Sequence, residues 1–122
     1  MKVEFTIPGT FPGMNEIIAA ANSNRHVYNK MKQEETDRVH REVLAAKVPH
    51  ITKPFVITYT WIAKDKRRDP GNIAAAEKFI GDGLRDAKVI PNDTWKYVSG
   101  IVHRFEIDPH NPRVEICIDE IE

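Results

Sequence analysis

The chain has little of the residue types that define several classes of protein. It has 122 residues and a single cysteine, Cys117, which excludes an internal disulfide framework and a cysteine-rich zinc site. Cys117 lies in the alternating run "VEICIDEI", which predicts a buried strand residue. No apolar run approaches the ~20 residues of a membrane-spanning helix, and the first residues lack the apolar core of a signal peptide. We therefore expect a cytoplasmic protein.

The chain also has no excess of charge of either sign. Lys plus Arg and Asp plus Glu number 18 each, so the formal net charge is zero. No overall field then attracts a nucleic acid or a membrane, and such a partner must be met by a local patch. The composition, 41% hydrophobic and 30% charged, is that of a globular protein, and the length predicts a single domain over residues 1–122.

Apolar patterning in the first half predicts two strands and one long helix, and it allows a short helix before the long one. Residues 2–7 alternate as a half-buried strand, and residues 14–24 can hold a short helix. Residues 28–48 form a long polar segment, which we interpret as a surface helix. Its narrow apolar stripe consists of Met31, Val39, Val43 and Leu44. Residues 55–63 are β-branched and aromatic on both faces, which favours a central strand.

The second half predicts one helix and two strands. Asn72 can cap a helix that runs to about Arg85. Residues 97–107 and 113–121 alternate as strands, and the turn-forming sequence between them predicts a hairpin. The resulting order, β-α-β-α-β-β, predicts an α+β fold: a mixed sheet with helices mainly on one face.

Charged residues gather at the start of the second predicted helix. Lys66, Arg67 and Arg68 precede Asp69, and Asp93 lies in the turn after the helix. Carboxylates on loops that flank a helix are typical Mg²⁺ ligands, and the bound ion can activate a phosphodiester. Lys78 lies about one and a half turns into the helix, where it could reach a phosphate. The plainer interpretation, a solvated loop followed by a helix-surface pair of Lys78 with Asp82, stays open.

The segment "RRDPGNIAAAEKFIGDGL" (67–84), followed by "AKVIPNDTWKYV" (87–98), resembles the RusA-type Holliday junction resolvases of bacteria and their prophages. The resemblance implies a homodimeric, Mg²⁺-dependent endonuclease that cuts four-way DNA junctions in recombination and repair. It implies that Asp69 and Asp93 hold the metal and that Lys78 and Asn72 complete the catalytic group. Lys66, Arg67 and Arg68 would contact the DNA backbone. Arg25, Lys30 and Lys32 could widen this DNA-binding face, or they could form a solvated helix face.

One position departs from the family pattern, because Gly71 stands where the family has its second aspartate. Three outcomes stay open: Asp65 or Asp82 compensates, the protein binds junctions and cuts them poorly, or position 71 is altered in this lineage. A helix over 72–86 is ~22 Å long, and residues 87–93 span at most ~24 Å. Asp93 therefore joins Asp69 in the same chain only if the turn doubles back or the helix ends early, near Gly81. Otherwise Asp93 serves a site elsewhere or in a partner subunit. A third possibility is a small α+β protein that acts through protein contacts.

Overall fold

Four strands form one mixed sheet with the order β1-β4-β2-β3. The computed structural model describes residues 1–121. The strands are β1 (Lys2–Pro8), β2 (Phe55–Ala63), β3 (Val98–Ile107) and β4 (Arg113–Glu120). β4 runs antiparallel to both β1 and β2, whereas β3 runs parallel to β2. The predicted mixed sheet and its central strand are therefore confirmed.

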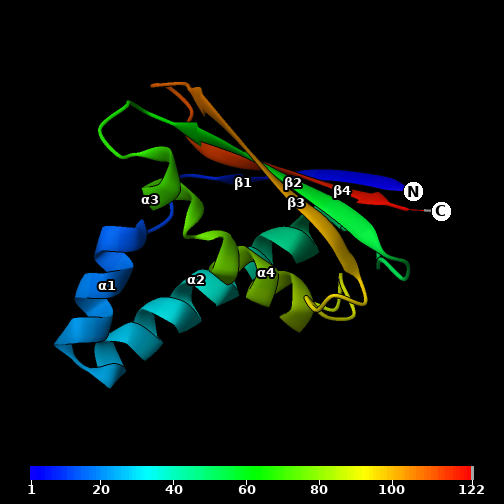
Figure 1. Ribbon diagram of the computed structural model, residues 1–122, viewed down its shortest axis with the longest axis horizontal. Coiled ribbons are helices and arrows are strands. Elements are labelled where there is room, and N and C mark those ends of the chain that lie inside the picture. Colours follow the sequence, from blue (N-terminus) through cyan, green and yellow to red (C-terminus); the bar gives the residue numbers. More distant parts are fainter. Residues whose placement is uncertain (122) are drawn as a thin grey trace.

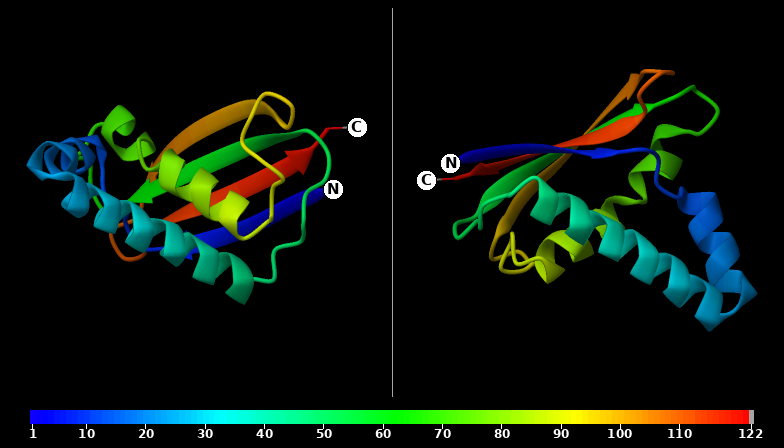
Figure 2. Two further views of the ribbon diagram at one scale, coloured as in Figure 1. Left: turned by 90° about the horizontal axis from the view of Figure 1, so that it is seen from below. Right: turned by 180° about the vertical axis from the view of Figure 1, so that it is seen from behind.

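The helices lie together on one face of this sheet (Figures 1 and 2). They are α1 (Met14–Ser23), α2 (Arg25–Ala45), α3 (Pro70–Ala74) and α4 (Glu77–Asp86). This arrangement confirms the α+β class and the placement of helices that the sequence predicts. In residues 1–121, none of the helices combines the length and the apolar character that a bilayer crossing requires.

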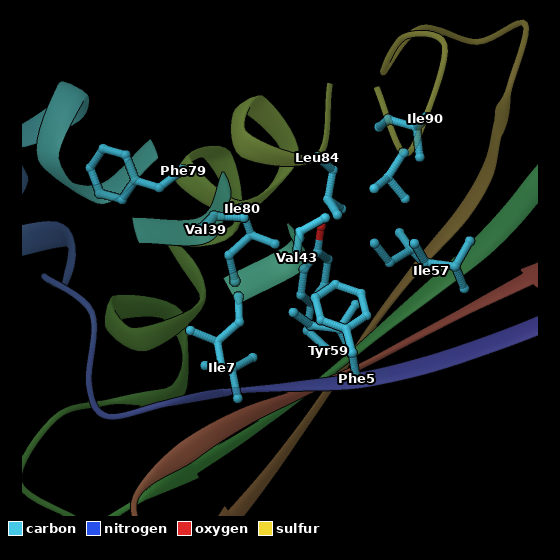
Figure 3. Packing of buried hydrophobic residues seen from close by; sticks show 14 of the residues in the cluster. Phe5, Ile7, Val39, Val43, Ile57, Tyr59, Phe79, Ile80, Leu84 and Ile90 are labelled. Atoms are coloured by element: carbon cyan, nitrogen blue, oxygen red, sulfur yellow. The ribbon is translucent and has the colours of Figure 1, made fainter. Parts of the chain in front are cut away.

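The core is built from rows of apolar side chains that lie at paired positions on neighbouring strands. Phe5, Ile116 and Tyr59 are register partners on β1, β4 and β2, and all three are buried. Figure 3 shows Phe5, Ile7 and Tyr59 on the side of the sheet toward α2 and α4, which contribute Val39, Val43, Ile80 and Leu84. Because the strand side chains alternate, the opposite face of the sheet carries the polar residues.

β3 and β4 do not form the predicted hairpin, because β2 lies between them. The connecting loop crosses the end of β2, where Asp108 donates its backbone N–H to the carbonyl of Ala63. Arg113 holds the loop through Asp108 and the carbonyl of Asn111. β2 is the most apolar strand and is buried by pairing on both edges, whereas β3 is largely exposed and lies at one edge.

The helix predicted after Asn72 begins earlier and is interrupted. Asp69 precedes the first turn with an extended backbone, and Pro70 occupies the first helical position, which proline favours. The segment breaks at Ala75 and Ala76, where hydrogen bonds change to the tighter i to i−3 pattern. The break turns α4 so that its apolar side chains face the sheet, and Ala76 itself is fully buried.

Two apolar side chains lie outside the core that the sequence predicts. Leu44 points to solvent, because α2 covers the sheet only with the stripe of Val39 and Val43. Cys117 is only half-buried, because it points to the face of β4 that carries no helix. Burial raises the pKa of the Cys117 thiol, which keeps it protonated and unreactive near neutral pH.

Candidate functional site

A buried carboxylate, Asp82, is the centre of a charged cluster between α2 and α4. Only 3% of Asp82 is exposed, because α4 turns this side chain toward α2. Three cations surround it: Lys78 at 3.5 Å, Arg85 at 3.4 Å and Lys32 at 3.9 Å. Its Oδ1 has no hydrogen bond within 1–121, so the cations alone offset its charge.

Two of these cations also contact Asp93. Lys78 Nζ lies 3.5 Å from Asp93 Oδ2, and Arg85 Nη1 lies 3.6 Å from Oδ1. The Asn92 side chain accepts a hydrogen bond from the backbone N–H of Thr94, which shapes the turn carrying Asp93. The sequence predicts Lys78 and Asp93 as one group, and the structure brings them together. Asp82, Lys78, Asp93 and Arg85 form a closed ring of alternating charges, which we call the α4 ring.

The α4 ring borders a hollow of about 200 Å³. Glu77 lies on the wall of this hollow with Lys78 and Asp93. The Tyr59 hydroxyl donates a hydrogen bond to Glu77 Oε1 over 3.4 Å, and it ties this carboxylate to the central strand. The hollow thus has two carboxylates and one ammonium group on its wall, which is a suitable set of donors for a divalent cation beside a phosphate.

The pKa values of two groups show how the site holds its protons. Burial raises the pKa of Tyr59 well above its usual range, and the charge of Glu77 adds to this shift. Tyr59 therefore stays a neutral hydrogen-bond donor. The charge of Asp82 raises the pKa of Lys78, and Asp93 acts in the same direction. Lys78 therefore stays cationic at neutral pH and is unsuited to act as a general base.

The other predicted acid, Asp69, lies at the opposite end of the helical segment. It precedes Lys78 by nine residues, or roughly 13 Å of helical rise. Its side chain makes no capping hydrogen bond, and it borders a separate hollow of about 280 Å³ with Lys66 and Arg68. The structure therefore does not bring Asp69 and Asp93 together in one chain.

Asn72 acts as a link between helices. Its Oδ1 accepts a hydrogen bond from the backbone N–H of Asn15 over 3.4 Å, which ties α3 to the start of α1. The predicted N-cap role of Asn72 is therefore wrong, since Asp69 occupies that position. An added Cβ at Gly13 would approach Asn72 Oδ1 to 2.1 Å, so this close contact needs a glycine.

The basic residues before α3 are of two kinds. Lys66 and Arg67 are exposed, and Arg67 Nε lies 3.7 Å from Asp65. Arg68 is held more firmly: it donates to the carbonyl of Phe11 over 3.0 Å and lies 3.8 Å from Glu16. Lys66 and Arg67 are therefore accessible to solvent, whereas Arg68 anchors the loop to residues 11–16.

The predicted cations of α2 do not form one face. Lys32 joins the α4 ring through Asp82. Lys30 pairs with Glu34 over 3.9 Å, and Arg25 is exposed at the first residue of the helix. Of the three, only Lys32 lies beside the residues that the sequence predicts as catalytic.

Gly71 is not required by the backbone. Its φ is not in the left-handed region, and an added Cβ would meet no atom within 4 Å. No carboxylate occupies the space that an aspartate side chain at position 71 would fill. Asp65 instead accepts a hydrogen bond from the backbone N–H of Arg67, and Asp82 belongs to the α4 ring. No group of three metal-ligating side chains occurs within 1–121.

Three residues of the α4 ring and its hollow are not predicted from the sequence. Glu77 and Arg85 lie one residue before and seven residues after Lys78, and Tyr59 comes from β2. The i, i+4 and i+7 spacing of Lys78, Asp82 and Arg85 is a usable signal, because it places all three on one side of a helix. Nothing in the local sequence indicates that Tyr59 lies beside Glu77.

Comparison with protein-family models finds no match to the chain, and no curated protein matches it.

Proposed function

We propose that this protein is a Mg²⁺-dependent endodeoxyribonuclease. It resolves four-way DNA junctions by paired cleavage in recombination and repair, as a homodimer in the cytoplasm. The resemblance of residues 67–98 to the RusA-type resolvases suggests this activity. The observation that carries the proposal is the 3.5 Å contact of Lys78 with Asp93, since the two residues are remote in sequence and line one open hollow.

The carboxylates of this hollow suit a magnesium ion. Mg²⁺ usually takes one or two protein carboxylates and completes its shell with water and phosphate oxygens. Asp93 and Glu77 would hold the ion, because both lie on the wall of the same hollow. When bound there, the ion would polarise a phosphodiester and activate a water molecule. Asp69 of the same chain takes no part in this site, because it borders the other hollow.

The cations of the α4 ring would bind the scissile phosphate. Lys78 and Arg85 each contact Asp82 on the buried side and Asp93 on the open side. Asp82 therefore keeps both cations beside Asp93 before a substrate binds. Such preorganised positive charge stabilises the charge that develops on a phosphate in the transition state.

A second candidate function is junction binding with weak cleavage. The environment of Gly71 favours this function, because a Cβ added to Gly71 would have no carboxylate or other group within 4 Å. Asp69 then has no acidic neighbour at position 71, while the exposed Lys66 and Arg67 can still contact DNA. Binding through such contacts depends steeply on salt.

A labelled synthetic four-way junction distinguishes these functions. The protein is incubated with the junction with and without Mg²⁺, and the strands are resolved by electrophoresis. We expect symmetric cuts that require Mg²⁺ and disappear in D93N. D86N is the matched control, because Asp86 is an exposed aspartate of α4 with no ion pair within 1–121.

Binding of the junction without cleavage, followed by cleavage in G71D, would favour the second function. The G71D side chain fits without rearrangement, because the position is open. Absence of binding at low salt would contradict both functions.

A further inference from the structure

The inner face of the sheet continues onto β3, where α3 and α4 leave it partly open. Ile57 and Trp61 on β2 are buried, and their register partners on β3 are Ile101 and Phe105. Ile101 is 47% exposed, Phe105 is 40% exposed, and Ile107, farther along β3, is 44% exposed. Figure 2 shows β3 at the edge of the sheet, on the side away from β1. An apolar surface that is buried on the other strands is thus partly open here.

The two edges of the sheet differ in how they are protected. β1 is short, and its exposed positions carry Lys2, Glu4 and Pro8, which discourage pairing with another strand. β3 has ten residues and no proline, and its outer edge presents unpaired backbone groups beside exposed apolar side chains. Such an edge is a template for an additional strand.

The charges on β3 match a second copy of the same strand. Arg104 and Glu106 flank Phe105, and neither has an ion-pair partner among residues 1–121. If two β3 strands pair antiparallel about Phe105, Arg104 of each copy lies opposite Glu106 of the other. Opposite charges at directly paired positions stabilise a sheet by roughly 0.2–1 kcal/mol each.

We propose that two copies join edge to edge through β3, with the two-fold axis at Phe105, into one continuous sheet of eight strands. Side chains at paired positions lie on the same face, so the apolar inner faces of both copies meet beside the axis. The inference deepens the homodimer of the proposed function by naming its surface. It rests on the sheet edge and not on the nuclease activity.

This interface would also bring the two basic loops together. Phe105 borders the hollow that contains Lys66, Arg68 and Asp69. With Phe105 on the axis, the hollows of both copies lie next to it, and each adjoining loop carries four cations (Lys64, Lys66, Arg67 and Arg68) against two acids (Asp65 and Asp69). A protein of zero net charge would thereby present a local patch to a DNA backbone.

The test is the molar mass in solution, measured without DNA by light scattering and analytical ultracentrifugation. We expect a dimer of the 14.0 kDa chain. In R104E, acidic side chains face one another at both 104–106 pairs of the interface, and in E106R basic side chains do so. Each single variant should therefore weaken dimerisation at least tenfold. The double variant R104E/E106R should restore it. E4R, a charge reversal on the other edge, is the control and should leave the dimer unchanged.

A monomer at 100 µM, or a dimer that neither single variant weakens, would overturn the proposal. So would a double variant as weak as the single ones. These residues are exposed, so circular dichroism should find every variant folded. A dimer that fails to cut junctions would contradict the nuclease proposal alone, whereas a monomer that cuts them would contradict this interface alone.

Discussion

The two ends of the α3–α4 segment hold their charged side chains in different ways. At the Asp93 end, buried Asp82 fixes two cations that both contact Asp93. At the Asp69 end, the acid has no capping hydrogen bond and faces an open hollow. Preorganised charge favours catalysis, whereas exposed and unrestrained charge is suited to binding. The proposed function would accordingly place the chemistry at the α4 ring and the DNA contact at the loop before α3.

The largest effect should come from removing the lysine of the α4 ring. K78M deletes the cation that contacts both Asp82 and Asp93, and we expect the single-turnover rate of junction cleavage to fall by roughly 100-fold or more. K78R, which keeps the charge, should retain part of the rate. Equal rates for K78M and the wild type would remove Lys78 from the reaction.

A glycine-to-alanine substitution should change the free energy of unfolding in opposite directions at the two ends of the α3–α4 segment. At Gly83, where α4 meets α2, an added Cβ would lie 2.5 Å from Val39 Cβ and 3.2 Å from the Thr36 carbonyl. We expect G83A to lower the free energy of unfolding by about 3 kcal/mol. At Gly71 the added Cβ meets nothing, and G71A should raise the free energy by roughly 0.5 kcal/mol.

Thermal unfolding followed by circular dichroism measures both effects. At roughly 4 °C per kcal/mol, G83A should lower Tm by about 12 °C and G71A should raise it by about 2 °C. If the two variants shift Tm alike, the close helix contact at Gly83 is not as described.

The smallest effect concerns the pH dependence of stability. Pairing raises the pKa of Lys78, so the folded state holds this proton more tightly than the unfolded chain does. The stabilisation is complete below the unfolded pKa of ~10.5 and is lost as pH rises through the folded value. Because Lys78 is largely exposed, we expect less than about 1 kcal/mol. The stability difference between wild type and K78M should therefore be constant from pH 6 to 9 and shrink above pH ~11. Urea unfolding across this range measures it, with K30M as control for an exposed helix lysine.

Much of the fold follows from local patterns, because alternation and burial depend on residues close in sequence. The alternation of residues 2–7 predicts a strand and the apolar character of residues 55–63 predicts a central strand, and both predictions are confirmed. The turn sequence before Arg113 is compatible with a hairpin and with a loop over a neighbouring strand, so it could not decide the order of strands. The break at Ala75 and Ala76 has no proline or glycine as a signal, because tertiary packing produces it.

The candidate site was predictable only in part, because it depends on contacts between elements that are distant in sequence. The family resemblance names Lys78 and Asp93, and the structure places their side chains 3.5 Å apart. The burial of Asp82 depends on how closely α2 approaches α4, which no spacing within α4 reveals. The sequence pairs Asp69 with Asp93 as ligands, but the geometry of a single chain separates them.

The most direct test compares the two acids at the ends of the segment. Single-turnover cleavage of a four-way junction is measured in Mg²⁺ for D93N and D69N, with D86N as control. We predict that D93N loses at least 100-fold in rate, whereas D69N loses less than 10-fold and chiefly weakens binding. Equal losses in D93N and D69N would contradict the account, because the two acids would then serve one shared site.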